Sequence, residues 1–236
     1  MAARRLSAAQ TVADAAARAA PGELPRTLCL SVRDVLAVDG AALSLFTDTP
    51  SRQLLCASDA TALRLEEIQF TVAEGPCISA ASEDVAVVGG GLRQHVTRWP
   101  FFGATVVAEL PEVGAVHAFP LRVADQTLGC MELYTRGEDA LDAPTLRACA
   151  QVADAVVRAL LPARTALFDD CAFPQWQPVD VVRAHWSSTH LAVGVVAARS
   201  GMSIAGALAT MRAEAFSSGR TLAEITAAVL GRPPSA

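Results

Sequence analysis

The C-terminal stretch from His185 to Leu230 constrains the fold most, because it divides into three short segments with helical apolar spacing. In each segment the apolar residues recur every three or four positions, which places them on one face of a helix. Isolated helices of this length are marginal in water, so each must bury its apolar face against a neighbour. The pattern therefore predicts a small three-helix unit. Its three apolar stripes are Leu191, Val195, Ala198 and Met202; Ile204, Ala207, Leu208, Met211 and Ala215; and Leu222, Ile225 and Val229.

Residues with strong capping preferences stand between these segments. Gly201 follows the first segment and Ser203 precedes the second, as expected for a helix C-terminus and an N-cap, respectively. A Ser-Ser-Gly sequence at 217–219 ends the second segment. Thr221 and Glu224 then have the T-x-x-E spacing of a capping box, which predicts the start of the third helix.

The basic charge of the chain is concentrated in the same part. All 19 basic residues are arginine, and the net charge of the whole chain is −5. From Pro178 onward there are five arginines and three acidic residues, a net charge of +2, which leaves −7 for the preceding part. An acidic chain is not expected to coat nucleic acid or an anionic membrane broadly, but a mildly basic tail is compatible with a nucleic-acid-binding module.

Three sequence blocks of the tail carry a family resemblance. They are the run from Leu191 to Ser203, the residues 207–215 with the pattern A-L…M-R…A, and the residues 220–225 with the pattern R-T-L…I. In order and spacing these blocks resemble an ANTAR domain. The resemblance implies an RNA-binding output module of a bacterial transcription antiterminator, which recognises paired small hairpins in nascent transcripts and is coupled to a sensor domain.

Five residues are the candidates for RNA contact. The planar guanidinium of arginine keeps its charge and donates several hydrogen bonds to phosphates and base edges. The candidates are Arg199, Arg212 and Arg220, with His190 and Arg183 on the same predicted surface. A solvated helical face is the alternative interpretation of these side chains.

The tail departs from the ANTAR pattern at three positions that bear on RNA binding. Val193 stands where the family typically has lysine, and Thr221 and Ala223 stand where it often has basic residues. An alternative function follows: the tail keeps the helical fold but serves dimerisation or protein docking without RNA binding. Under that alternative, restoring basic residues such as Val193→Lys and Thr221→Arg should create binding.

The part before the tail alternates helical patterns with short apolar runs bounded by turn residues. Strands bracketed by helices in this way predict an α+β sandwich with an antiparallel sheet. The predicted helices are 6–20, 28–36, 58–67, a helix that ends near 110, and 143–161; the predicted strands are 42–46, 53–57, 68–72, 85–88, 114–123 and 128–134.

Several small motifs in this part occur in a recognisable order. They are D-G-A-A-L from Asp39, C-A-S-D from Cys56, E-G-P-C from Glu74, R-W-P-F-F from Arg98, F-P-L-R-V from Phe119 and L-G-C from Leu128. Together they resemble a GAF domain of the type that precedes ANTAR modules in actinobacterial regulators. The resemblance implies a pocket that senses an unnamed small molecule or a redox signal, and a homodimer formed through the helices that flank the sheet.

The two resemblances predict an α+β GAF domain with N-terminal helices over residues 1–162 and an all-α three-helix ANTAR domain over 178–236. Pro162 is expected to break the last helix of the first domain. The segment 163–177 between the domains contains Phe168, Phe173 and Trp176, which predict that it packs against a folded domain. The predicted function is therefore a signal-responsive, RNA-binding regulator of transcription antitermination.

Five residues are the candidates for ligand binding in the GAF part. Cys77 follows the Gly-Pro turn at a helix start, where the helix dipole favours a thiolate; an inert residue at a helix start is the alternative. His117 on a sheet face is a candidate ligand contact or a satisfied core histidine. Trp99 and Phe102 are placed where a lid would cover the sheet, although core packing explains them equally well. The full set is Cys77, Trp99, Phe102, His117 and Cys56.

Catalytic motifs are not found. The four histidines are scattered, and the sequence contains no G-x-S-x-G, P-loop or H-E-x-x-H motif, so an enzyme is not expected. A minor alternative is a thiol-based reductase with the GAF fold, in which Cys77 or Cys56 would need a second cysteine nearby. The six cysteines show neither C-x-x-C nor zinc-ligand spacing, so no metal site is expected. The sequence leaves the identity of any cofactor open. Reduced cysteines and the lack of an apolar run of membrane length predict a cytoplasmic protein that does not bind membranes.

Overall fold

The computed structural model describes residues 6–46, 52–89, 91–92, 98–168 and 188–231. These residues belong to two compact units, one built from 1–45 and 55–176 and the other from 46–54 and 177–236. The predicted docking of the interdomain segment, beyond residue 168, lies outside the described residues, and so does Arg183.

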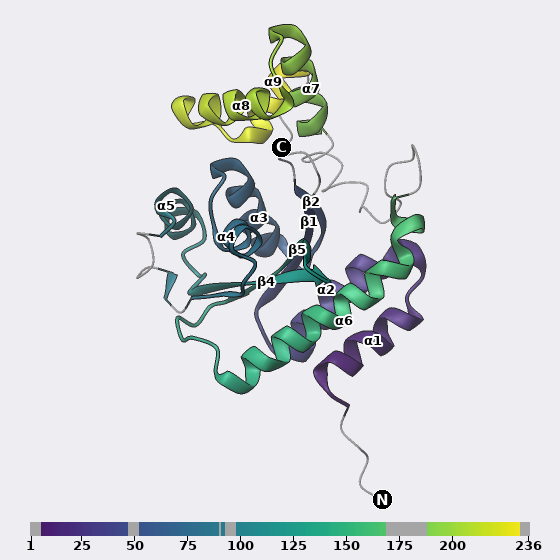
Figure 1. Cartoon of the computed structure of the whole chain (residues 1–236). Helices are drawn as coiled ribbons and strands as arrows, with labels where there is room; N and C mark the ends of the chain where they lie inside the picture. Colours follow the sequence, from purple (N-terminus) through teal and green to yellow (C-terminus); the bar gives the residue numbers. More distant parts are fainter. Residues whose placement is uncertain (1–5, 47–51, 90, 93–97, 169–187, 232–236) are drawn as a thin grey trace, which may run out of the picture. The chain divides into compact units, whose positions relative to one another are not determined.

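A five-stranded sheet forms the centre of the larger unit, in the order β2-β1-β5-β4-β3 (Figure 1). Strand β5 pairs with both β1 and β4, and β4 pairs with β3, in each case antiparallel. The predicted antiparallel sheet is therefore confirmed. The strands are β1 (Gly40–Phe46), β2 (Arg52–Ala57), β3 (Val87–Val88), β4 (Ala115–Val123) and β5 (Gln126–Thr135).

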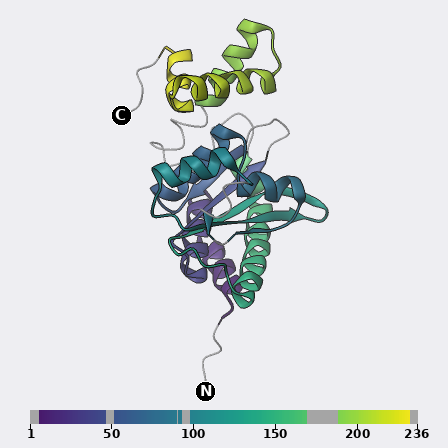
Figure 2. The same cartoon turned by 90° about the vertical axis from the view of Figure 1, so that its left-hand side faces the viewer.

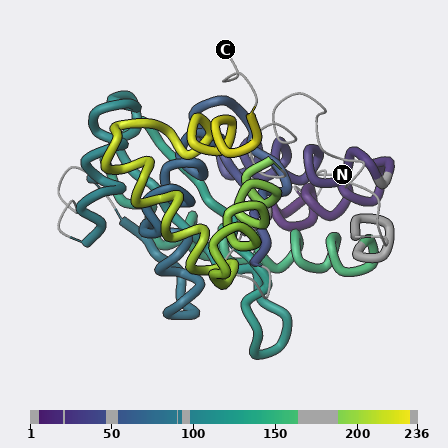
Figure 3. The backbone as a smooth tube through the Cα atoms, turned by 90° about the horizontal axis from the view of Figure 1, so that it is seen from above, coloured from purple at the N-terminus to yellow at the C-terminus, as the bar shows by residue number. Residues whose placement is uncertain are grey.

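Three helices cover one face of the sheet: α1 (Ala8–Arg18), α2 (Leu24–Leu36) and α6 (Ala143–Phe168). Helix α1 lies against both α2 and α6, as the view in Figure 3 shows. Their apolar faces meet the sheet in one core, because aliphatic side chains of both layers are fully excluded from solvent. This core includes Val12, Leu28, Val32, Leu43, Phe119, Leu121, Met131, Leu133, Val152 and Val156.

A second helical layer covers the opposite face. It consists of α3 (Ala60–Val72), α4 (Pro76–Glu83) and α5 (Pro100–Glu109), and Figure 2 looks onto this layer. Helix α4 contacts β4 and β5 directly, and α3 contacts α5. The sheet thus lies between two layers of helices, each with its apolar side toward the strands. The alternation of helical and strand patterns in the sequence predicted this sandwich.

Two sequence predictions about secondary structure are wrong. Residues 68–72, expected as a strand, belong to helix α3. Asp59 caps this helix through a hydrogen bond to the Ala62 N–H, and Ala62, Leu65 and Ile68 bury one helical face, so tertiary packing outweighs the strand preference of a β-branched run.

The second wrong prediction concerns Pro162, which lies inside helix α6 and does not end it. A proline removes the hydrogen bond to the carbonyl four residues earlier, here that of Arg158. Both residues are on the exposed side of the helix, so water can solvate the freed carbonyl. The first six residues of the predicted interdomain segment therefore belong to α6.

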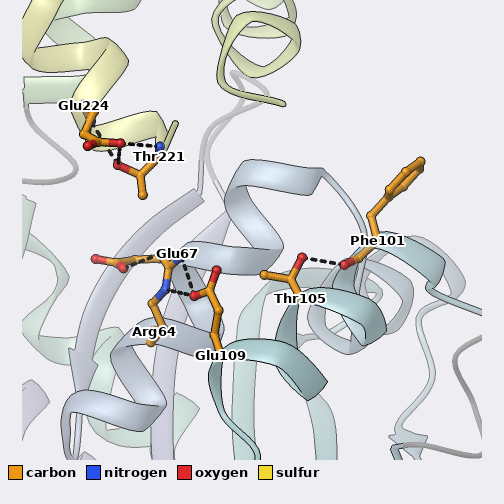
Figure 4. A network of polar contacts seen from close by, with 7 residues as sticks. All are labelled: Arg64, Glu67, Phe101, Thr105, Glu109, Thr221 and Glu224. Carbon is orange, nitrogen blue, oxygen red and sulfur yellow. Dashed lines mark hydrogen bonds and ion pairs between the residues drawn. The ribbon is translucent and has the colours of Figure 1, made fainter. Parts of the chain in front are cut away.

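The described residues of the smaller unit form three helices: α7 (Ser188–Ser200), α8 (Ile204–Ser218) and α9 (Leu222–Val229). Each contacts the other two, so the predicted three-helix arrangement is observed. Ser203 caps α8, and Gly219 ends it in the left-handed conformation at φ +65°. The predicted capping box of α9 is present: the Thr221 hydroxyl accepts from the Glu224 N–H, and the Glu224 carboxylate accepts from the Thr221 N–H (Figure 4).

Helix α7 buries a different face from the one predicted. Leu191 and Met202, members of the predicted stripe, are 54% and 45% exposed. The buried face starts at Thr189, whose hydroxyl lies 3.2 Å from that of Thr226 on α9. Small side chains on this face allow the helices to approach closely. The spacing of the apolar residues in the sequence did not reveal this face. The buried residues of α7 are Thr189, Ala192, Val193 and Ala197.

Within the described residues, no helix alone is long and apolar enough to cross a membrane. Helices α7 and α8 meet such a criterion only together, and they are bent by 106° relative to each other.

Candidate functional site

The Gly75-Pro76-Cys77 turn sets the position of helix α4. Gly75 has φ +140°, a conformation that residues with a side chain rarely adopt, and Pro76 occupies the first turn of the helix. A Cβ atom at Gly75 would lie 2.5 Å from the side chain of Gln69 on α3. Position 75 therefore requires glycine for two reasons: its backbone conformation and the close approach of α4 to α3.

Cys77 lies between two buried carboxylates. Its Sγ is 3.1 Å from Oε2 of Glu132 on β5 and 3.6 Å from Oε1 of Glu66 on α3. All three residues are almost completely excluded from solvent, with relative exposures of 0%, 1% and 0% for Cys77, Glu132 and Glu66. Ionisable groups at this depth are uncommon unless they are hydrogen-bonded or functional, so this thiol–carboxylate cluster is the candidate functional site.

Gln69 holds the cluster together from α3. Its Nε2 donates a short hydrogen bond to Oε2 of Glu132, and its Oε1 accepts a hydrogen bond of 2.8 Å from the backbone N–H of Cys77. A single buried amide thus fixes both the start of α4 and the carboxylate on β5. Because a buried amide must find partners for its donors and acceptor, this arrangement also explains why Gln69 is tolerated at 0% exposure.

The electrostatics of Cys77 contradict the expected thiolate. Burial raises the pKa of the Cys77 thiol well above its ordinary value, and the neighbouring Cys130 thiol and the carboxylates of Glu132 and Glu66 raise it further. The helix N-terminus contributes at most about 2 kcal/mol in favour of a negative charge, which is less than the cost of burying an unpaired thiolate. Cys77 is therefore a neutral thiol that donates to a carboxylate.

His117 lies on the other face of the sheet. It is paired with Leu133 of β5, whereas Glu132 is paired with Ala118 of β4, and successive side chains of a strand point to opposite faces. His117 is fully buried, and neither ring nitrogen has a hydrogen-bond partner among the described residues. Burial lowers the pKa of His117 to about 4. It is therefore a neutral core residue, remote from Cys77.

Cys56 is also separate from the cluster. Its thiol donates to the Pro25 carbonyl at 2.9 Å, and it belongs to the core between the sheet and α2. Burial, followed by the neighbouring thiol of Cys29, raises the pKa of Cys56 well above its ordinary value. The described cysteines are all buried free thiols, in agreement with the sequence analysis: Cys29, Cys56, Cys77, Cys130 and Cys149.

Trp99 and Phe102 lie on the same side of the sheet as Cys77. Their rings meet edge to face at 6.4 Å, and the indole N–H of Trp99 donates to the Ser79 hydroxyl of α4 at 2.9 Å. The Phe102 N–H donates to the carboxylate of Glu74, which precedes α4. Both aromatic residues are buried, so they anchor the start of α5 against α4.

Sequence comparisons identify no relative: no protein-family model matches the chain, and a search of curated proteins finds no match. Solved structures do match. The GAF domain of a phosphoenolpyruvate-protein phosphotransferase from Coxiella burnetii aligns with a TM-score of 0.53 at 10% identity, covering 67% of this chain and 94% of that one. The larger unit has the fold of a GAF domain.

Other structures with this fold differ in their activities. A methyl-accepting chemotaxis protein fragment aligns with a TM-score of 0.50 at 10% identity, covering 66% of this chain and 98% of that one. A free methionine-R-sulfoxide reductase from Neisseria meningitidis aligns with a TM-score of 0.51 at 11% identity, covering 70% and 99%, respectively. The GAF fold thus occurs in signalling proteins and in reductases, and function has to be argued from the site itself.

A partly exposed ion-pair network joins helices α3 and α5 of the GAF unit. Arg64 of α3 bonds to Glu67 at 2.9 Å and to Glu109 of α5 at 2.8 Å (Figure 4). Within α5, the Thr105 hydroxyl donates to the Phe101 carbonyl. Surface ion pairs contribute little individually, about 1 kcal/mol or less, so this network mainly orients α5 relative to α3.

The candidate RNA-binding residues of the smaller unit differ in exposure. Arg199, near the end of α7, and His190, near its start, are exposed. Arg220 is exposed and donates one hydrogen bond of 2.9 Å to the Glu224 carbonyl, whereas Arg212 on α8 is half-buried. Arginine has five N–H donors, so the contact of Arg220 leaves donors available for a ligand.

Proposed function

We propose that this chain is a signal-responsive regulator in which the GAF unit senses a small molecule or a redox signal and the C-terminal unit binds RNA hairpins. The observation that carries the proposal is the order of the two units. A unit with the GAF fold and a buried polar cluster precedes a three-helix unit that contains the sequence blocks that resemble an ANTAR domain.

Charge supports RNA as the partner of the C-terminal unit. The exposed guanidinium groups of Arg199 and Arg220 lie in a part of the chain whose net charge is +2, while the preceding part carries −7. Phosphate groups attract such cations, and the acidic part repels RNA, so contact is expected to be confined to the tail. With few cations available, binding should depend only modestly on salt.

Burial of the thiol–carboxylate cluster supports sensing as the role of the GAF unit. Cys77 is a neutral, solvent-excluded thiol, which is a poor nucleophile for turnover. A buried polar group nevertheless responds strongly to a change of charge or bonding, because the low dielectric of the interior amplifies electrostatic interactions. We therefore expect the chain to act as a regulator and not as an enzyme.

RNA binding is tested by fluorescence anisotropy with a leader RNA that contains two hairpins. We expect Arg199→Gln and Arg220→Gln each to weaken binding, and each lost phosphate contact to reduce the slope of log K against log salt by about one. Arg136→Gln, an exposed arginine of the GAF unit, is the matched control and should bind normally. If the RNA does not bind in any redox state, RNA recognition is excluded as the function.

A second candidate function rests on the apolar surface of the smaller unit. Phe216 is 71% exposed on α8, and Leu191, Met202 and Ile204 are 54%, 45% and 43% exposed. Exposed apolar side chains of this kind favour the alternative in which the tail serves dimerisation or docking. Sedimentation of the wild type and Phe216→Ser distinguishes the two: loss of a dimer with unchanged RNA binding would assign the surface to assembly.

The reductase alternative depends on access to a thiol. Cys77 interacts with Cys130, and Cys56 with Cys29, so each candidate thiol has the neighbouring cysteine that the sequence did not reveal. Buried thiols with raised pKa values should react slowly with a thiol reagent in the native protein. Rapid labelling of Cys77, together with reduction of free methionine sulfoxide, would instead support a reductase.

A further inference from the structure

Three side chains with metal-ligating atoms meet in the interior of the GAF unit. One ligand atom each from Glu66, Cys77 and Glu132 can be chosen so that all lie within 4.8 Å of one another. The three residues come from three different elements, α3, α4 and β5, and are all buried. Only the tertiary fold brings them together, because they are separated by 11 and 55 residues in the sequence.

The spacing of these atoms fits a tetrahedral metal ion. Zinc binds thiolate sulfur at about 2.3 Å and carboxylate oxygen at about 2.0 Å, so a tetrahedral angle places sulfur and oxygen about 3.5 Å apart. The Cys77 Sγ lies 3.1 Å from the Glu132 oxygen and 3.6 Å from the Glu66 oxygen. We propose that the GAF unit binds a divalent transition-metal ion, Zn²⁺ in particular, through Glu66, Cys77 and Glu132.

The chemistry of the donors selects the class of metal. A sulfur donor favours Zn²⁺ and its neighbours in the transition series over Mg²⁺ and Ca²⁺, which prefer sites made of oxygen atoms alone. Binding replaces the thiol proton of Cys77 by the metal, and this proton leaves to solvent. Gln69 and Cys77, the two residues that donate to Oε2 of Glu132, carry no formal charge.

Gln69 is the positioning residue of the proposed site. It bonds to a carboxylate ligand through Nε2 and to the backbone of the thiol ligand through Oε1. Partners of this kind orient metal ligands, and their loss typically reduces metal affinity by about 10-fold to 100-fold. Three protein ligands leave one tetrahedral position open, as in zinc sites that accept a small molecule. Metal binding by the GAF unit does not depend on RNA binding by the C-terminal unit.

The site is tested with Co²⁺, whose absorption reports its ligands, on the reduced, chelator-treated full chain. We expect a sulfur-to-cobalt charge-transfer band, the visible bands of tetrahedral Co²⁺, and loss of both when Zn²⁺ is added. Cys77→Ser should abolish the charge-transfer band, and Glu66→Gln or Glu132→Gln should weaken Zn²⁺ binding more than about tenfold. Cys149→Ser, which removes a buried thiol of α6, is the matched control and should retain both.

Gln69→Met, which keeps the size of the side chain without its hydrogen bonds, should lower the affinity but keep the charge-transfer band. Circular dichroism verifies that each variant is folded. If Cys77→Ser does not fold, the Zn²⁺ affinity of Glu66→Gln still tests the proposal. A charge-transfer band that persists in Cys77→Ser, or Zn²⁺ affinity equal in the wild type and both glutamine variants, would overturn the proposal. Because no RNA is present, failure of the metal site and failure of RNA binding are distinguished.

Discussion

His117 and Glu132 lie on neighbouring strands but point to opposite faces of the sheet. The register pairs His117 with Leu133 and Glu132 with Ala118, so one residue faces the core under α6 and the other faces α4. The two ionisable groups therefore act in separate environments. One is a neutral histidine in an apolar core, and the other belongs to a polar cluster.

The environment of His117 predicts a pH dependence of stability. Burial lowers the pKa of His117 to about 4, below the value of about 6.5 in the unfolded chain. At a pH between these two pKa values, His117 is protonated in the unfolded state and neutral in the folded state. The free energy of unfolding therefore falls as the pH decreases from about 6.5 to about 4, by about 3 kcal/mol at most.

Replacement of His117 by Gln should remove this component. Urea unfolding of the wild type and His117→Gln at pH 7 and pH 4.5 measures it as the difference between the two proteins. His190→Gln should change the pH dependence in the same direction but less, because burial lowers the pKa of His190 as well. An identical pH dependence of the wild type and His117→Gln would show that His117 is accessible to protons in the folded state.

Gly75→Ala should destabilise the GAF unit. The backbone of Gly75 has φ +140°, and the added Cβ would lie 2.5 Å from the Gln69 side chain, so both strain and a clash result. We expect a loss of about 2–4 kcal/mol in the free energy of unfolding, measured by urea denaturation. Gly137→Ala, where a Cβ would meet no atom within 4 Å, should be nearly neutral.

Thr221→Ala should loosen the start of α9. The Thr221 hydroxyl accepts from the Glu224 N–H at 3.1 Å, and loss of such an N-cap typically costs about 1 kcal/mol. Amide hydrogen exchange along residues 222–229 should become faster by roughly fivefold, since 1.4 kcal/mol corresponds to tenfold. Thr210→Ala, which removes an exposed hydroxyl inside α8, should leave the exchange of α9 unchanged.

Val193→Lys should unfold the C-terminal unit and should not create RNA binding. Val193 is 3% exposed on the face of α7 that packs against its neighbours, so a lysine there would bury a charge. The expected loss is about 3 kcal/mol or more, visible as a lower melting temperature of the three helices. Leu191→Lys on the same helix is the control, because Leu191 is 54% exposed.

If Val193→Lys unfolds the C-terminal unit, this substitution cannot test whether the tail has lost only its RNA-contacting residues. Thr221 is exposed and Ala223 is half-buried, so Thr221→Arg costs the N-cap of α9 but buries no charge, whereas Val193→Lys buries one. A stable Val193→Lys protein with gained RNA affinity would show that the lysine side chain reaches solvent from this position.

Local signals in the sequence were sufficient for many features of the chain. The caps at Ser203 and Gly219 and the capping box of Thr221 and Glu224 occur where expected, because each depends on contacts between residues at most a few positions apart. The Gly-Pro turn before Cys77 was predicted for the same reason, as were the strands over 114–123 and 128–134, which pair as β4 and β5.

Only the tertiary structure decided the features that depend on burial and on distant partners. Residues 68–72 became helical, and α7 turned its small residues inward, because packing determines which of several local patterns is used. The pKa of Cys77 is raised and not lowered because desolvation depends on surroundings that lie far away in the sequence. The same is true of the meeting of Glu66, Gln69, Cys77 and Glu132, since no spacing within one segment encodes contacts between two helical layers and a strand.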